Sequence, residues 1–221
     1  MEIIILALIA AVVLYKLYKV LGDNKFDSQR PPVLSKIPDG KKQAVRELKS
    51  VSPPTPEDLK ALDSANEKKY GKDLWENIKA VQQINRAFNP DLFTSGAHDA
   101  FETIIKAYAR GDVEKLETLL SKTMLATLQA EIVKRKSRGE EHETTLIAVV
   151  SCEMKTIQYD KKNIQITVRF VTDQVNLVKD THGKVIEGDP SHIDRVVDIW
   201  TFEHALHGSD PNWLLVKVAV E

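Results

Sequence analysis

The chain has 221 residues, and its 31 Lys plus Arg balance 32 Asp plus Glu, so no basic excess exists to bind nucleic acid. A single cysteine, Cys152, excludes an intramolecular disulfide framework and a thiolate zinc cage, which both need several sulfur atoms. The glycines form neither of the two common Gly-rich phosphate-binding loops. We therefore predict no cofactor, no metal and no nucleic-acid partner.

The N-terminal segment, residues 1–21, predicts a single membrane-spanning anchor. Residues Ile3–Tyr15 are all apolar or aromatic, and only Lys16 and Lys19 interrupt the extension of this run to Leu21. At about 1.5 Å per residue this helix spans roughly 28 Å, which matches a hydrocarbon core of about 30 Å if both lysines snorkel to one interface. A cleaved signal peptide and a buried or interfacial helix are the alternatives. Lysines after the run place the rest of the chain in the cytoplasm.

Residues 22–73 predict a flexible arm that is rich in proline and poor in large apolar residues. Two stretches of it have helical character: the basic Lys41–Lys49, and Pro56–Lys69 with Thr55 as its N-cap. Each is expected to be either a short solvated helix or a surface that rests on anionic lipid. In the second case Lys41 and Lys42 join the two anchor lysines as candidate membrane contacts.

Residues 74–90 predict an amphipathic helix. Leu74, Ile78, Val81 and Phe88 have the spacing of one helical face, and Trp75 flanks them. This helix is expected either to pack against the folded domain or to dock on a membrane or another protein.

Residues 91–221 predict the folded domain, which begins with three helices. The first is expected from Ser95 and ends at Gly111, the second is short and capped by Asp112, and the third runs from about Thr123 to just before Gly139. The inward faces consist of Ala97, Phe101, Ile104, Ile105 and Tyr108, then Leu116, Leu119 and Leu120, then Met124, Leu125, Leu128 and Ile132.

The third helix ends in a basic cluster of Lys134, Arg135, Lys136 and Arg138. Cations at a helix C-terminus stabilise it through the helix dipole by a few tenths of a kcal/mol each, about 0.3 kcal/mol at a surface. The cluster is expected to be either a solvated helix end of this kind or a contact site for an anionic partner.

After Gly139 the hydrophobic period changes from 3.6 to 2, which predicts strands of an antiparallel sheet. We expect strands at Thr144–Tyr159, Ile164–Phe170, Val175–Lys179, Val196–His204 and Trp213–Val220. The fold class is accordingly α+β, with N-terminal helices packed on one face of a curved antiparallel sheet.

Asp198 is the candidate catalytic residue, because alternation places it on one strand face with Trp200 and Phe202. Aromatic surroundings raise a carboxyl pKa and can make it a general base. The alternative is that Asp198 lies at an open rim or accepts hydrogen bonds from Arg195 or the backbone. Without a partner group, we predict no catalytic site and treat Asp198, Trp200, Phe202 and Trp213 as candidate partner or pocket residues.

The histidines and the single cysteine give little indication of a metal site or a reactive group. His204 and His207 lie at a strand end without nearby carboxylates at metal-binding spacing. Cys152 alternates with Val150 and Met154, so it is expected to be a small core residue rather than a reactive thiol.

Several short motifs between Phe93 and Leu215 resemble the C-terminal domain of the Tim44 family, membrane-associated adaptors of mitochondrial inner-membrane protein import, and their bacterial relatives. They are Phe93-Thr-Ser-Gly96-Ala97, Ala109-Arg-Gly111-Asp112, Ile164 to Phe170, Gly183-Lys-Val-Ile-Glu-Gly188-Asp189, Val197-Asp198-Ile199-Trp200-Thr201-Phe202-Glu203 and Asp210-Pro211-Asn212-Trp213-Leu214-Leu215. The resemblance implies the cone-shaped fold of nuclear transport factor two and ketosteroid isomerase.

The front of the chain departs from the mitochondrial protein, because an apolar anchor and a short arm replace the presequence and the chaperone-recruiting region. The bacterial relatives are the better match, which implies the bacterial cytoplasmic membrane with the domain inside. We expect a non-catalytic, membrane-anchored adaptor for protein transport or assembly, with a protein partner and an apolar ligand or peptide in its cavity. The alternatives are a cone-fold enzyme or small-molecule carrier that uses Asp198, and a structural scaffold subunit.

Overall fold

The computed structural model describes residues 55–207 and 212–220. The predicted anchor at 1–21, the helical stretch Lys41–Lys49 and the four lysines expected at the membrane lie outside the described residues. The chain divides into two compact units, residues 1–61 and 62–221. The described start of α2 (Pro56–Tyr70) shows the predicted cap: the Asp58 amide donates to the Thr55 hydroxyl at 3.2 Å, and the Thr55 amide donates to the Asp58 carboxylate at 2.8 Å.

The second unit begins with the end of α2, which is joined to the helix α3 (Lys72–Ile84) at Gly71. The positive φ of Gly71, 82°, permits the sharp change of direction. The Trp75 indole donates to the Asp63 carboxylate at 2.6 Å, and its ring stacks on Tyr70 with 6.0 Å between centroids. Tyr70 in turn donates to Asp91 at 2.8 Å, which ties this turn to the next helix.

Packing of α3 against the domain, one of the two expected outcomes, is confirmed. Trp75, Ile78 and Val81 are buried and belong to the main hydrophobic core. The predicted extent is wrong, because the helix ends at Ile84 and Asn85 is extended. Phe88 still reaches the core from the loop that follows.

The three domain helices are α4 (Pro90–Arg110), α5 (Val113–Glu117) and α6 (Lys122–Ser137). Our expected start of α4 at Ser95 is wrong. The Asn89 side chain accepts hydrogen bonds from the amides of Asp91 at 2.9 Å and Leu92 at 3.0 Å, and a proline follows it at the first helical position. These features start the helix earlier than its apolar stripe indicates.

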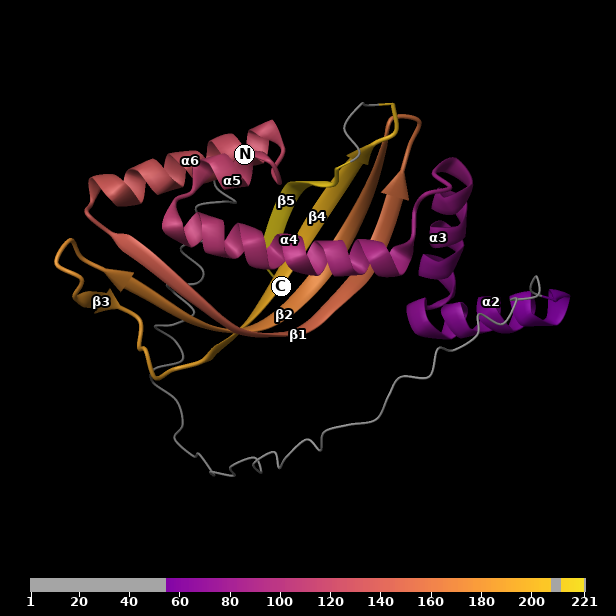
Figure 1. Cartoon of the computed structure of the whole chain (residues 1–221), viewed down its shortest axis with the longest axis horizontal. Coiled ribbons are helices and arrows are strands. Elements are labelled where there is room, and N and C mark those ends of the chain that lie inside the picture. The colour runs from indigo at the N-terminus through magenta and orange to yellow at the C-terminus, as the bar shows by residue number, and fades with distance from the viewer. Residues whose placement is uncertain (1–54, 208–211, 221) are drawn as a thin grey trace, which may run out of the picture. The chain divides into compact units, whose positions relative to one another are not determined.

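Five antiparallel strands form one sheet: β1 (Glu141–Tyr159), β2 (Asn163–Lys179), β3 (Val185–Glu187), β4 (Asp194–Ala205) and β5 (Leu214–Val220). The strand order is β1-β2-β4-β5, with β3 also paired to β2. The two strands expected at Ile164–Phe170 and Val175–Lys179 are one continuous strand. Figure 1 shows the curved sheet with α4 crossing it.

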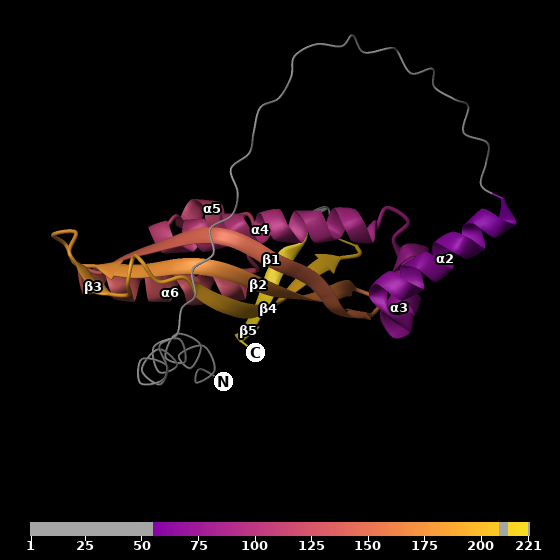
Figure 2. The ribbon, with the colours of Figure 1, turned by 90° about the horizontal axis from the view of Figure 1, so that it is seen from below.

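The core lies between α4 and one face of the sheet. Along β2 every second residue from Ile164 to Gln174 is buried. Phe101 of α4 stacks on Phe170 with 4.4 Å between ring centroids and lies 4.5 Å from Trp200. Figure 2 shows α4 and α5 on one side of the strands and α6 at the level of the strands. The predicted α+β class with helices packed on a curved antiparallel sheet is confirmed, but the three helices do not all lie on one side.

Within residues 55–207 and 212–220, no helix is both long enough and apolar enough to cross a membrane.

Candidate functional site

An apolar groove of about 720 Å³ opens where the first turns of α4 meet the ends of β4 and β5. Its wall comes from four places: the α3–α4 loop, one face of α4, the segment after α5, and the end of β4 with the residues just before β5. The lining residues are Asn85, Ala87, Phe88, Asn89, Leu92, Phe93, Gly96, Ala97, Ala100, Thr118, Leu119, Phe202, His204, Asn212 and Trp213. Among the residues that the structure describes, this lining contains no Lys, Arg, Asp or Glu, so the groove favours an uncharged, apolar occupant.

Aromatic packing around Phe93 forms the floor of the groove. Its ring centroid lies 4.8 Å from Trp213, 6.2 Å from Phe202 and 6.1 Å from Phe88. These edge-to-face and tilted contacts stabilise aromatic pairs by about 0.5–1.5 kcal/mol beyond area burial, so the floor is a rigid surface. The groove is therefore preformed in its aromatic part.

The rim of the groove is formed by small or exposed residues of α4. Leu92 is 72% exposed although it is a large apolar residue. A Cβ added at Gly96 has no atom within 4 Å, so the wall there is open. An exposed leucine beside an apolar hollow is the kind of surface that binds a partner.

Of the four predicted pocket residues, the structure brings two to the groove. Phe202 and Trp213 line it, whereas Trp200 is only 3% exposed and packs in the core beside Phe101 and Phe170. The prediction that Trp200 is a pocket residue is therefore wrong. It lies two residues before Phe202 on β4, where Phe101 of α4 packs against it.

Asp198, the fourth, does not line the groove either. It is half-buried on β4, opposite Phe170 in the sheet register. Burial raises its pKa from 3.8 to about 6, and the nearby Trp200 indole opposes this rise slightly, although that N–H makes no hydrogen bond of ordinary geometry. The expected partner Arg195 instead binds Asp173, at 2.8 and 3.0 Å.

Sequence reasoning missed the α4 wall of the groove, namely Leu92 and Gly96 together with the capping residue Asn89. A signal for it was present: Asn followed by Pro is a strong helix start. From that start, positions 92, 93, 96 and 97 share one face, because residues three and four apart are neighbours on a helix.

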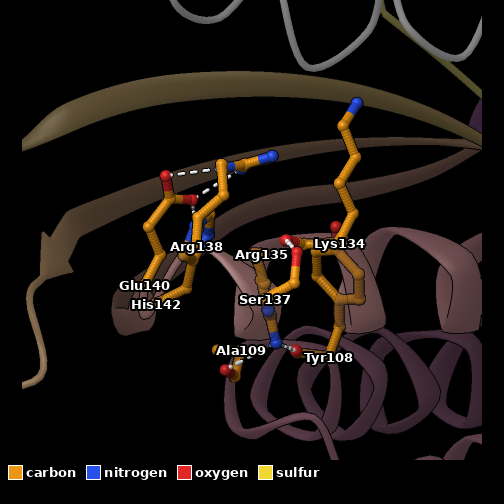
Figure 3. Close-up of polar contacts among 8 residues, drawn as sticks. All are labelled: Tyr108, Ala109, Lys134, Arg135, Ser137, Arg138, Glu140 and His142. Carbon is orange, nitrogen blue, oxygen red and sulfur yellow. Dashed lines mark hydrogen bonds and ion pairs between the residues drawn. The ribbon is translucent and has the colours of Figure 1, made fainter.

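The basic cluster at the end of α6 divides into residues with different roles (Figure 3). Arg135 is only 4% exposed, and its Nη2 donates to the carbonyl oxygens of Tyr108 and Ala109, the latter at 2.9 Å. Its guanidinium also lies 4.7 Å from the Tyr108 ring centroid. Arg135 is therefore buried and does not belong to the exposed basic surface, and its bonds close the C-terminal end of α4.

The other three members of that cluster are exposed, but they are not equivalent. Arg138 binds Glu140 through two nitrogens, at 2.7 and 2.6 Å. Lys134 extends away from Arg135 in Figure 3. Of the four cluster residues, Lys134 and Lys136 are the solvent-exposed cations that form no ion pair with another described residue.

Cys152 behaves as predicted. It is half-buried against the core, and its Sγ lies 3.7 Å from the Thr94 carbonyl oxygen. Burial raises the pKa of the thiol to about 11, which keeps it protonated at neutral pH. His204 lies at the groove, with its ring 5.2 Å from Trp213.

Comparison with known proteins places this geometry in context. Residues 74–220 match the family model described as the Tim44-like domain. The mitochondrial import inner membrane translocase subunit TIM44-1 of Arabidopsis thaliana is 22% identical over 145 residues, which are 66% of this chain and 28% of that protein.

A second translocase subunit and a solved structure are also similar to parts of this chain. The probable mitochondrial import inner membrane translocase subunit tin-44 of Caenorhabditis elegans is 26% identical over 53% of this chain and 28% of its own length. The match thus spans about a quarter of these relatives. Among solved structures, the intermembrane space region of the chloroplast protein ARC6 is 13% identical with a TM-score of 0.41, over 57% of this chain and 95% of that one.

Proposed function

The chain belongs to the Tim44-like family, and from this premise we propose that it is a non-catalytic adaptor that holds a protein of a membrane transport or assembly machinery. The observation that carries the proposal is the uncharged, aromatic groove between α4 and the sheet. An occupant of this groove is an apolar segment of the partner, because the lining offers aromatic surface and no charge to pair.

The groove also explains why binding is favoured over catalysis. Among the described residues that line it, His204 is the one titratable side chain, and no second acid or base stands beside it there. General acid–base catalysis needs groups within hydrogen-bonding reach of the reacting atoms. The groove supplies shape and apolar surface instead.

Placement at the membrane is the second part of the proposal. It is supported by the apolar residues 1–21, by the lysines that follow them and by the relatives, whose names place them in an inner-membrane translocase. We infer that the domain lies on the cytoplasmic side of a bacterial inner membrane. Protease added to intact spheroplasts should then leave the domain uncut, and digestion there would contradict this orientation.

An enzyme that uses Asp198 is the rival, and one observation favours it: a carboxyl with a pKa of about 6 suits a general base. Its position weighs against this reading. The carboxyl lies beside Trp200 on the core-facing side of β4 and does not line the groove, so a substrate in the groove does not meet it.

The test uses a photo-cross-linking residue at Leu92 in the full-length chain, in native membranes. We expect a cross-link to a membrane component of a protein transport or assembly machinery, identified by mass spectrometry. The matched position is Val133 of α6, which is similarly exposed at 62% but does not line the groove. Equal cross-linking of the same protein from both positions would show that the groove is not the binding surface.

A second variant separates loss of binding from loss of folding. Gly96→Leu fills the groove from a helical position with free space around its Cβ, and Gly96→Ala is the control that adds a Cβ without filling it. Both replace a helix-interior glycine, so both are expected to melt at or above the wild-type temperature. Gly96→Leu should reduce the Leu92 cross-link at least fivefold, whereas an unchanged yield with a folded protein would refute the proposal.

A further inference from the structure

A second cavity, separate from the groove, lies where the C-terminal ends of α4 and α6 meet the start of β1. Its volume is about 590 Å³. Charged and polar residues form most of its wall: Lys106, Ala109, Arg110, Arg135, Lys136, Glu140, Glu141, His142, Glu143, Thr144 and Thr145. This lining is unlike that of the apolar groove, and the proposed adaptor function does not use it.

Arg135 is the unusual member of this cavity. Its side chain is almost entirely buried, yet among the described residues it forms no ion pair with a carboxylate. Nη2 has two carbonyl acceptors, while Nη1 is buried without a hydrogen-bond partner. A buried charge without a counter-charge is costly, and a buried unsatisfied donor calls for a bound water or ion.

His142 provides a second unsatisfied nitrogen in the same cavity. Its Nε2 is buried without a hydrogen-bond partner, and the nearest carboxylate oxygen, Oε2 of Glu140, lies 3.7 Å away. That carboxylate is already held by Arg138 through two short hydrogen bonds. Two buried nitrogens from different elements, α6 and β1, therefore lack hydrogen-bond partners among the described residues, and the residues that carry them line one cavity. Figure 3 shows both residues beside the end of α6.

The residues that line the cavity carry a net positive charge when those that form an ion pair elsewhere in the protein are not counted. Glu143 pairs with Lys179, Lys106 pairs with Glu102 at 2.8 Å, and Glu140 pairs with Arg138. The lining residues without such a pair among the described residues are Arg110, Arg135 and Lys136 on the positive side and Glu141 on the negative side.

We propose that this cavity binds a phosphate-type oxyanion, free or as a monoester, which accepts hydrogen bonds from Arg135 Nη1 and His142 Nε2. Arg110 and Lys136 at the wall add attraction for a dianion. Both nitrogens are shielded from water in this structure, so binding requires the imidazole to turn and Nη1 of the guanidinium to move toward the cavity. Charge-assisted hydrogen bonds to an oxyanion are about twice as strong as neutral ones, which favours phosphate over water as the acceptor.

The test titrates the full-length chain in detergent with inorganic phosphate at constant ionic strength. We expect saturable binding by calorimetry, a melting temperature that rises with phosphate but not with chloride, and a shift of the His142 imidazole NMR signal, assigned through His142→Gln. Glycerol phosphate is titrated in a second experiment. If it binds as tightly as inorganic phosphate, the site is open to a phosphate monoester of a larger molecule. If only inorganic phosphate binds, the ligand is the free ion. Acetate, with one charge, should bind at least tenfold more weakly.

Two neighbouring lysines on α6 provide a matched pair of variants. Lys136→Gln removes a cation that lines the cavity and should raise the dissociation constant for phosphate at least fivefold. Lys134→Gln removes a lysine that does not line the cavity and should change the constant less than twofold. Arg135 is left intact, because its bonds to the α4 carbonyls hold the helices together.

Two results would overturn the proposal. The first is the absence of phosphate binding beyond the effect of chloride. The second is equal weakening by Lys134→Gln and Lys136→Gln, which would mean that phosphate is attracted only by the basic surface. Loss of binding in His142→Gln with an unchanged melting temperature would support the site and exclude a folding defect.

Discussion

Asp198 offers a prediction whose sign and size both follow from its surroundings. Its pKa is raised from 3.8 to about 6, because burial beside aromatic residues disfavours the charged carboxylate. In the unfolded chain the carboxyl loses its proton near pH 4, whereas in the folded chain it keeps the proton up to about pH 6. Folding stability therefore falls as the pH rises through this window and stays reduced above it.

The size of the effect comes from the pKa difference. Each unit corresponds to 1.36 kcal/mol, so the charged carboxylate costs at most about 3 kcal/mol at pH 7. Asp198→Asn replaces it with a neutral group of the same shape, and we expect a gain of about 2 to 3 kcal/mol at that pH. For a domain of this size the gain corresponds to a melting temperature higher by roughly 5 to 10 °C.

The assay is thermal unfolding of the full-length chain and of Asp198→Asn between pH 3.5 and 8. The difference between the two proteins should be near zero at pH 3.5 and should grow to its full size by pH 7. Asp173→Asn is the control of opposite sign, because Arg195 lowers the pKa of that carboxyl and the variant should lose stability at neutral pH. A constant difference at every pH, or an Asp198→Asn protein that is less stable at pH 7, would refute the burial argument.

Two further predictions concern the core and a loop. Trp200→Ala should lower the free energy of unfolding by about 3 to 5 kcal/mol, because the ring is buried among aromatic residues. Trp213→Ala, at the groove, should lower it clearly less. Urea unfolding measures both variants, and equal losses of stability would contradict the assigned burial. Gly188→Ala should lower the melting temperature more than Gly183→Ala does. Both glycines have a positive φ, but only a Cβ added at Gly188 meets a backbone oxygen, that of Asn176, at 2.2 Å. Similar melting temperatures of the two variants would contradict that close approach.

The fold was largely predictable from the period of the hydrophobic residues, and the errors of that prediction have physical causes. We expected two strands where β2 is one, because the polar Thr172 and Gln174 interrupt the apolar alternation. Both point into the protein and are buried, and Gln174 donates to Thr172 at 2.7 Å, so the polar groups satisfy each other. Periodicity alone does not predict such pairs.

The candidate sites were predicted less well than the fold, because a site depends on which residues meet in space. Phe202 and Trp213 were identified, but the opposite wall of the groove belongs to α4, whose start was placed too late. Arg135 was grouped with the solvated lysines beside it, although it follows Ile132 by three residues and so falls on the inward face of α6. The signal was therefore present, but the run of charge concealed it. The proposed likeness to the cone fold of nuclear transport factor two stays a prediction.

The long helix α4 carries both cavities, which leads to a last prediction. Gly96 lines the groove and Arg110 lines the second cavity, so they are separated by about 21 Å along the helix at 1.5 Å per residue. Changes at such a distance without shared partners are usually additive within about 0.5 kcal/mol. In the double variant Gly96→Leu, Lys136→Gln, the partner cross-link should fall as in the first single variant and phosphate affinity as in the second. A groove variant that also weakens phosphate binding would show that α4 couples the two cavities and that neither proposal holds as an independent site.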